Sequence, residues 1–176
     1  MARAGCSWLG VGFSESIPYS FVCPIIVSQV RLGADSPLRY ALKTQNPLGE
    51  DTSVMRTTAL PSMLDILARN SANHNKAAKL YELAKVYLPV EGQVLPQEPK
   101  YLMLGTYGAG EDFFSLKGEL DAVLEALRLP AAQYTADTAN PSYHPGRCAR
   151  ITISGEDVGC MGQIHPLVAG NYGMDC

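Results

Sequence analysis

The sequence lacks any long hydrophobic run. No apolar segment approaches the roughly 20 residues that a membrane-spanning helix needs. The opening residues 1–16 also lack a continuous hydrophobic region followed by a small-residue cleavage site. We therefore expect a cytoplasmic protein that has no membrane partner.

A strong charge of one sign is also absent. The chain has 14 Lys and Arg against 17 Asp and Glu, so its formal net charge is −3. Nucleic acids are bound largely by clustered cations that displace counterions. This balance argues against a phosphate-binding surface over the whole fold, but it leaves room for a local basic patch.

The cysteines form no disulfide framework. There are five, an odd number, and they are widely scattered without a CxxC pair: Cys6, Cys23, Cys148, Cys160 and Cys176. Reduced thiols that act as small buried apolar side chains are therefore expected.

The composition is that of one globular domain. The 176 residues are 47% hydrophobic and 18% charged, which is enough to bury a sizeable core. Two pairs of apolar segments joined by short connections, 80–88 with 101–107 and 148–154 with 158–164, predict antiparallel strands. We therefore expect a single domain over residues 1–176 of the α+β class, with an antiparallel sheet flanked by helices.

Three helices are predicted. The first begins at Pro61 and stops at the asparagines from Asn70 onward, the second spans about residues 112–127, and a short third one starts at Pro166. The second strand pair should turn at residues 154–157, where a polar Ser-Gly-Glu-Asp segment separates its two strands.

Three further strand segments are predicted in the first third of the chain, and one of them is a strand-like run over residues 54–58 just before the first helix. Ile17, Tyr19 and Phe21 alternate with smaller residues, as one face of a strand should, and Pro18 indicates an edge or a strand start. A short strand is expected over residues 38–44, within a segment rich in Pro, Gly, Asn and Asp.

The first predicted helix carries one apolar stripe. Its members recur at helical spacing: Leu60, Met63, Leu64, Leu67 and Ala68. Asp65 and Arg69 should pair on the opposite side. The stripe has two interpretations that give the same periodicity, burial against its own sheet or packing against a partner helix, and the spacing does not separate them.

Candidate chemical sites are weak. Gly105, Gly108 and Gly110 lack the order of a dinucleotide or phosphate loop, and Glu111 and Asp112 after them would repel phosphate. A zinc site would use His144, Cys148, Cys160 and His165, whose spacing matches no standard ligand pattern.

Two other candidates rest on residue type alone. Cys148 with His144 is a nucleophile pair without local support, because such partners meet in space rather than in sequence. Lys117, Arg147 and Arg150 could touch RNA, but acids interrupt them and no aromatic platform accompanies them.

Three segments together resemble one family. They are NPLGEDTSVMRTTALPSMLDILARN (46–70), DFFSLKGELDAVLEAL (112–127) and YHPGRCARITISGEDVGCMGQIHP (143–166). In order and approximate spacing they resemble the beta subunit of bacterial phenylalanine–tRNA ligase. The segments GFSESIPYSFV (12–22) and KLYELAKVYLP (79–89) also resemble it, so the likeness covers nearly the whole chain.

The resemblance implies a domain with the core architecture of class II synthetases that has lost catalysis. An active site of that class needs an Arg followed at two residues by Glu, and every Arg here fails this pattern, including Arg56, Arg147 and Arg150. It also needs a Gly-rich segment that ends in Arg, whereas residues 159–170 offer none to hold a triphosphate. No catalytic, cofactor-binding or metal-binding residues are therefore expected in this chain.

The same resemblance implies partners and cofactors of a larger enzyme. The holoenzyme resembles an alpha2-beta2 heterotetramer that uses ATP and magnesium to charge tRNA with phenylalanine. This chain would then contact the alpha subunit and a second beta subunit, and would reach tRNA only through the holoenzyme. It would be a structural and assembly domain, truncated at its C-terminal end, that neither charges nor edits tRNA.

The resemblance favours one interpretation of the apolar stripe. The helix from Pro61 resembles an interface helix, so Leu60, Met63, Leu64 and Leu67 are predicted to contribute to intersubunit burial. Two alternatives stay open: a free-standing adenylating enzyme, which would need the missing arginines supplied otherwise, and an RNA-binding module.

Overall fold

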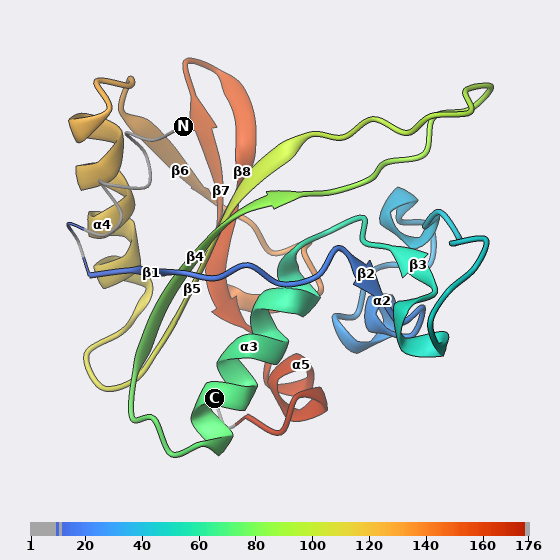
Figure 1. The fold of residues 1–176 in the computed structure, drawn as a ribbon. Helices are drawn as coiled ribbons and strands as arrows, with labels where there is room; N and C mark the ends of the chain where they lie inside the picture. The colour runs from blue at the N-terminus through green and yellow to red at the C-terminus, as the bar shows by residue number, and fades with distance from the viewer. Residues whose placement is uncertain (1–9, 11, 175–176) are drawn as a thin grey trace.

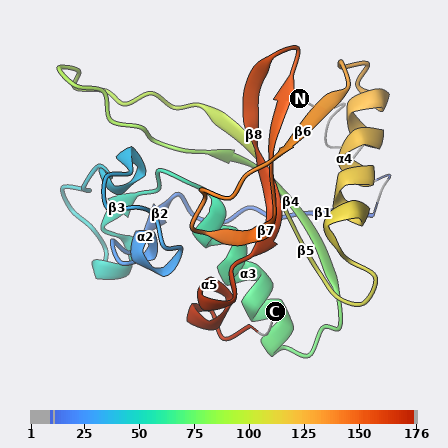
Figure 2. The ribbon, with the colours of Figure 1, turned by 180° about the vertical axis from the view of Figure 1, so that it is seen from behind.

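The computed structural model of the chain describes residue 10 and residues 12–174, and it has helices on both sides of antiparallel strands (Figures 1 and 2). The strands of the main sheets are β1 (Ser14–Glu15), β4 (Ala78–Lys85), β5 (Lys100–Tyr107), β6 (Ala132–Ala136), β7 (Tyr143–Ile153) and β8 (Glu156–Ile164). Their orders are β1-β4-β5 and β6-β7-β8, with every pairing antiparallel except β1 with β4. The predicted α+β class is confirmed.

Both predicted hairpins are present. β4 and β5 pair over eight residues each, and β7 and β8 are joined at Ser154 and Gly155. These two residues have φ of 53° and 85°, and two consecutive positive values are the geometry of the commonest tight hairpin turn. The turn is shorter than the four residues predicted, because strand pairing resumes at Glu156.

The three predicted helices are α3 (Leu60–Ala72), α4 (Phe113–Ala126) and α5 (Pro166–Asn171). The start of α4 is fixed locally, since Asp112 Oδ1 accepts from the backbone N–H groups of Phe114 and Ser115 at 2.8 and 2.7 Å. Ser115 Oγ in turn accepts from the Asp112 N–H, which completes a capping box. Among the described residues, every helix is too short or too polar to cross a bilayer.

The predictions for the first third of the chain are partly wrong. Residues 17–20 form no strand, and only β2 (Phe21–Val22) pairs, with β3 (Val54–Met55). In place of a strand over 38–44 the chain forms a 3-10 turn, η1 (Pro37–Arg39), and a single bridge from Lys43 to Val54. Both causes are local. Pro18 has no N–H to donate to a neighbouring strand, and Ser36 Oγ caps η1 by accepting a hydrogen bond from the Leu38 N–H. The sequence also gave no signal for β6, α2 (Ile26–Gln29) or η2 (Glu50–Thr52).

The core lies on the two faces of the β4–β5 hairpin. On one face the buried residues Phe13, Tyr81 and Val123 pack with the half-buried Leu104, Leu116, Leu120 and Leu127. Three of the seven belong to α4, and Leu127 follows its last residue. The other cluster joins α3 to α2 and α5 and comprises Val30, Leu60, Leu64 and Val168, with Met103 of β5 among its half-buried neighbours. The hairpin is therefore covered by α4 on one side and by α3 on the other.

The contact between α3 and β5 depends on a glycine. A Cβ at Gly105 would lie 2.8 Å from Leu67 Cδ1 and 2.8 Å from Met63 Cγ, well inside contact distance. Both neighbours are almost fully buried, so they have little room to move.

We expect Gly105→Ala to lower the free energy of unfolding by about 1–3 kcal/mol, because overpacking forces buried side chains from their preferred rotamers. Gly118 in α4 is the matched control, since a Cβ there meets nothing within 4 Å. Gly118→Ala should raise stability by about 1 kcal/mol through helix propensity. Urea unfolding measures the free energy of unfolding of both variants. Equal changes in the two would contradict the close packing of α3 on Gly105.

Candidate functional site

The four predicted interface residues lie in the interior of the chain. The exposed fractions of Leu60, Met63, Leu64 and Leu67 are 7%, 1%, 2% and 5%. They pack α3 against its own sheet, which is one of the two alternatives that the apolar spacing predicted. A single chain contains no partner surface, so a role between subunits stays a prediction. The predicted Asp65–Arg69 ion pair is present on the outer side of α3.

The outer side of α3 is therefore the part of this helix that another subunit could reach. Asp65 and Arg69 are exposed there, and Ser62 and Ile66 are half-buried. Ile66 gives this face an apolar centre between polar neighbours.

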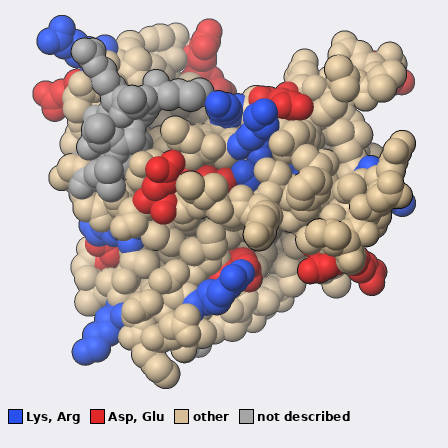
Figure 3. Space-filling view, in the orientation of Figure 1, with Lys and Arg blue, Asp and Glu red and all other residues tan. Residues whose placement is uncertain are grey.

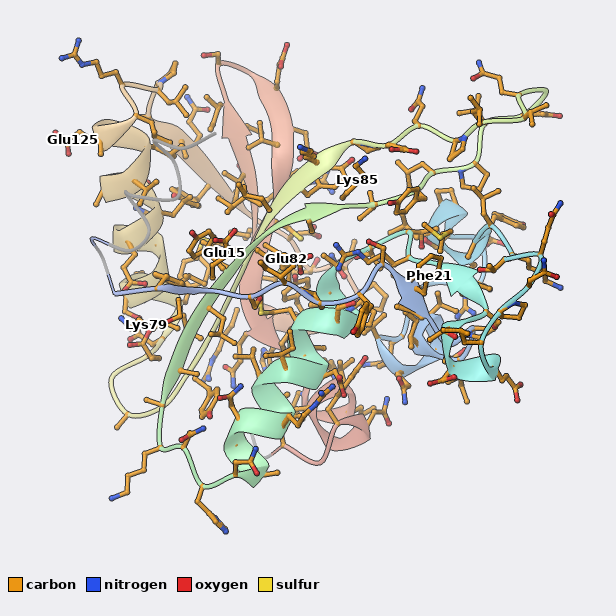
Figure 4. The ribbon with its side chains drawn as sticks, viewed as in Figure 1. Glu15, Phe21, Lys79, Glu82, Lys85 and Glu125 are labelled. Carbon is orange, nitrogen blue, oxygen red and sulfur yellow. The ribbon has the colours of Figure 1, made fainter. Side chains whose placement is uncertain are left out.

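A buried ion pair fixes the chain just before α3. Arg56 Nη2 donates to Glu82 Oε1 of β4 at 2.5 Å, and Arg56 Nε donates to the Lys85 carbonyl at 3.0 Å. The two side chains are only 3% and 6% exposed, and Figure 4 places Glu82 in the interior. The backbone of Arg56 bonds Ser20 and Tyr87 as well, so this residue joins the start of the chain, β4 and α3.

The pair is strongly desolvated. Burial raises the pKa of the Glu82 carboxyl above its usual value, and the hydrogen bond from Arg56 offsets part of this rise. Arg56 Nη1 and Glu82 Oε2 have no hydrogen-bond partner among the described residues. This arginine therefore serves the fold rather than a ligand phosphate. The sequence held a signal for this pair that was not used: an acid at position 82 between the apolar Tyr81 and Leu83 of a predicted strand.

Removing one member of this pair should be costly. We expect Glu82→Gln to lower the free energy of unfolding by about 3–5 kcal/mol, because it leaves the Arg56 charge buried without a counterion. The double change Arg56→Met with Glu82→Leu should cost much less than either single change, since no charge remains inside. Glu98→Gln, which breaks the exposed Lys85–Glu98 pair, is the control and should have little effect. Urea unfolding measures these free energies. If the destabilisation of the double variant equalled the sum of the two single ones, the energetic coupling of Arg56 with Glu82 would be contradicted.

The basic residues that could have touched RNA already have partners. Arg150 lies 3.0 Å from Asp157 and 3.6 Å from Asp137, and Lys117 lies 2.8 Å from Asp121 and over the Tyr134 ring. Arg147 donates to Gln163 Oε1 at 2.5 Å. On the face drawn in Figure 3, basic and acidic side chains are interspersed outside the grey residues. The three cations do not combine into a phosphate-binding patch.

The glycine-rich segment is a turn between β5 and α4. Gly108 has φ of 125° and packs on Ala77, and Glu111 forms an ion pair with Lys79 at 2.9 Å. Because the capping box occupies the first N–H groups of α4, this helix start offers no anion site.

The histidines and cysteines of the zinc alternative serve separate local roles. His144 Nδ1 accepts from Gly146 N–H, and His165 Nδ1 accepts from Leu167 N–H at the start of α5. Burial raises the pKa of the Cys148 thiol to about 11, so it stays protonated near neutral pH and is a poor nucleophile. In the described part of the chain, no three His, Cys, Asp or Glu side chains gather as metal ligands. Cys6 and Cys176 lie outside that part.

Eight of the fifteen large exposed hydrophobic residues in the described part of the chain belong to one end of the molecule. They come from two segments that extend to the same side in Figures 1 and 2: a lobe made of residues 17–57, and an arm made of residues 86–99 between β4 and β5. Their large exposed residues are Ile17, Tyr19, Phe21, Ile25, Tyr40, Leu48, Val94 and Leu95. Such a grouping is typical of a protein-contact surface.

The fold matches that of a known tRNA synthetase. The solved structure of a pyrrolysyl tRNA synthetase from Desulfitobacterium hafniense superposes with a TM-score of 0.75 over 98% of this chain and 60% of that chain. At 12% identity this likeness concerns the fold alone. The predicted class II synthetase-like architecture is confirmed.

Sequence comparison gives the family. The chain belongs to the family of the phenylalanyl tRNA synthetase beta chain CLM domain, whose family model matches residues 3–176. Phenylalanine–tRNA ligase beta subunits of Clostridium tetani and Clostridium acetobutylicum are 42% and 44% identical over 95% and 92% of this chain. The chain spans only about a fifth of the length of these relatives, 21% and 20%. The resemblance found in the sequence is thus confirmed.

Proposed function

We propose that this chain is a non-catalytic assembly domain of a phenylalanine–tRNA ligase beta subunit. Its partners would be the alpha subunit and a second beta subunit, and tRNA would be reached only through the holoenzyme, in the cytoplasm. One observation carries this proposal. The chain has a synthetase-type fold and belongs to the beta-chain family, yet its buried Arg56 is paired with Glu82 and is not directed at a ligand.

The described residues do not fit ATP and magnesium, which the holoenzyme would use for aminoacylation. Magnesium needs oxygen ligands that converge, and no such carboxylate group gathers in the described part of the chain. A triphosphate needs cations free to meet it. Arg56 is buried against Glu82, and Arg150 is flanked by Asp137 and Asp157. We therefore derive no adenylation step for this chain.

The two alternative functions have less support. A free-standing adenylating enzyme would need the cations that the sheet does not present. An RNA-binding module would need a basic or aromatic surface, whereas Lys117, Arg147 and Arg150 are engaged by neighbouring side chains.

The outer face of α3 is the best place to test assembly through this helix. Leu60, Met63, Leu64 and Leu67 would support the helix from beneath, so an acid at any of them would damage the fold first. Ile66 is half-buried on the outer side, and a charge there can be tolerated by the isolated chain.

We expect this chain to co-purify with the alpha subunit of the same enzyme, and Ile66→Asp to weaken the complex at least tenfold, because a charge would be desolvated at the contact. Phe114→Asp is the matched control, since Phe114 is 75% exposed on α4, which covers the opposite face of the hairpin. Calorimetric titration of the folded variants with the alpha subunit measures both.

A folded wild-type chain that does not bind the alpha subunit would overturn the assembly proposal. Equal binding by the wild type and by Ile66→Asp would keep assembly and remove α3 from the contact.

A further inference from the structure

A pocket opens within the lobe, among β2, α2 and β3, and its volume is about 130 Å³. These three elements lie together at one end of the molecule (Figure 1). The wall of the pocket is mainly apolar and includes Val22, Ile26, Val27, Ala41 and Met55. An apolar cavity of about 150 Å³ accepts a benzene molecule, so this pocket has room for a branched alkyl group of about four carbons.

Backbone hydrogen bonds hold the wall of this pocket in place. On one side of β3 lies its antiparallel partner β2. On the other side the Met55 N–H donates to the Leu42 carbonyl at 2.8 Å, and Lys43 forms a bridge with Val54. Residues 41–43 are therefore fixed beside β3, and the pocket is formed before any ligand arrives.

The charged side chains that line the pocket are all basic. They are Arg39, Lys43 and Arg56, and no Asp or Glu lines it. Arg56 is neutralised by Glu82, so the net charge comes from Arg39 and Lys43. Neither of these two has an acidic partner among the described residues. An anion in the pocket would therefore meet two cations that nothing else compensates.

Arg39 is positioned in advance. Its Nε donates to the Gly33 carbonyl at 2.8 Å, and its Nη2 donates to the Leu32 carbonyl at 2.5 Å. Both acceptors are neutral, so they fix the guanidinium without compensating its charge, and Nη1 takes part in neither bond. A side chain that is already held loses little conformational entropy when it binds a ligand. Lys43 is exposed, and its flexible stem can bring a second cation to the same anion.

We propose that this pocket binds a small monocarboxylate whose other end is a compact branched alkyl group. The alkyl group would lie against Val22, Ala41 and Met55, and the carboxylate would meet Arg39 and Lys43. An amino acid fits poorly, because no acid lines the pocket to accept its ammonium group. A nucleotide fits poorly as well, since pockets for ligands of that size have volumes of about 300 Å³ or more.

Isovalerate is the probe for this site, and methyl NMR spectra of the chain measure its binding. We expect the methyl signals of Val22, Ile26 and Met55 to shift with a Kd on the order of 1 mM, which is the range for so small a ligand. Met63 is the internal control, because it is buried under α3 outside the lobe and its signal should stay in place. Isovaleramide lacks the charge and valine adds an ammonium group, so each should bind at least about threefold more weakly.

Two substitutions separate the apolar wall from the basic residues. Ala41→Leu fills the space itself and should abolish detectable binding of isovalerate. Lys43→Gln removes one cation at an exposed position and should weaken isovalerate about threefold while leaving isovaleramide unchanged. Lys76→Gln is the matched control, because Lys76 is also exposed and lies outside the lobe. The exposed positions keep the test valid if Ala41→Leu fails to fold.

Four results would overturn the proposal. They are wall signals that do not shift with isovalerate, equal affinities for isovalerate and isovaleramide, equal affinities for isovalerate and valine, and full affinity in a folded Ala41→Leu variant. None of these measurements involves the alpha subunit, so the assembly role can stand or fall separately.

Discussion

The fold depends on a β4–β5 hairpin whose middle part, around Tyr81 and Gly105, is covered on both faces. α4 and Phe13 cover the Tyr81 side, and α3 covers the other side, close to Gly105. Glu82 is only 4% exposed in this covered part of β4, so its carboxylate needs a counterion inside the protein. Arg56 supplies it from the residues just before α3, and the same side chain reaches the Lys85 carbonyl at the end of β4. One ion pair thus links the hairpin to the helix that packs on it.

This arrangement uses the centre of the fold for stability. Where a synthetase core could present an arginine to a nucleotide, this chain directs one at its own glutamate. In the second hairpin Arg150 meets Asp157, and Arg147 meets the Gln163 amide. A buried pair of this kind gains little net stability, because desolvation of two charges offsets their attraction. The pair does constrain the fold, because any placement of β4 that separated Glu82 from Arg56 would leave a buried charge without a counterion.

The large apolar side chains that stay exposed lie mainly at the periphery. The large exposed apolar residues of the lobe and the arm lie away from the two-sided core, and several are at loop positions that strand pairing does not constrain. A few backbone hydrogen bonds shape the arm: the Leu88–Gln97 bridge, a bond from Val86 N–H to the Pro99 carbonyl and the turn from Gln93 N–H to the Val90 carbonyl. Its prolines have no N–H for further pairing. Family membership and this distribution of surfaces agree with a domain that joins other parts of a large enzyme.

Sequence patterns that act between near neighbours were sufficient to predict much of the secondary structure. The apolar periodicity defined α3 and α4 to within a few residues, Pro166 marked the start of α5, and the Ser154–Gly155 turn joined the last two strands, because each of these signals acts between near neighbours. The family segments were likewise readable in the sequence. Only the tertiary structure decided the long-range features: the pairing of Glu82 with Arg56 and the packing of the α3 stripe on its own sheet. It also decided that Ile17 and Tyr19, which alternate as in a strand, are exposed and pair with no other strand. Periodicity states which side chains share a face, but the element that covers that face is chosen by packing between residues far apart in the chain.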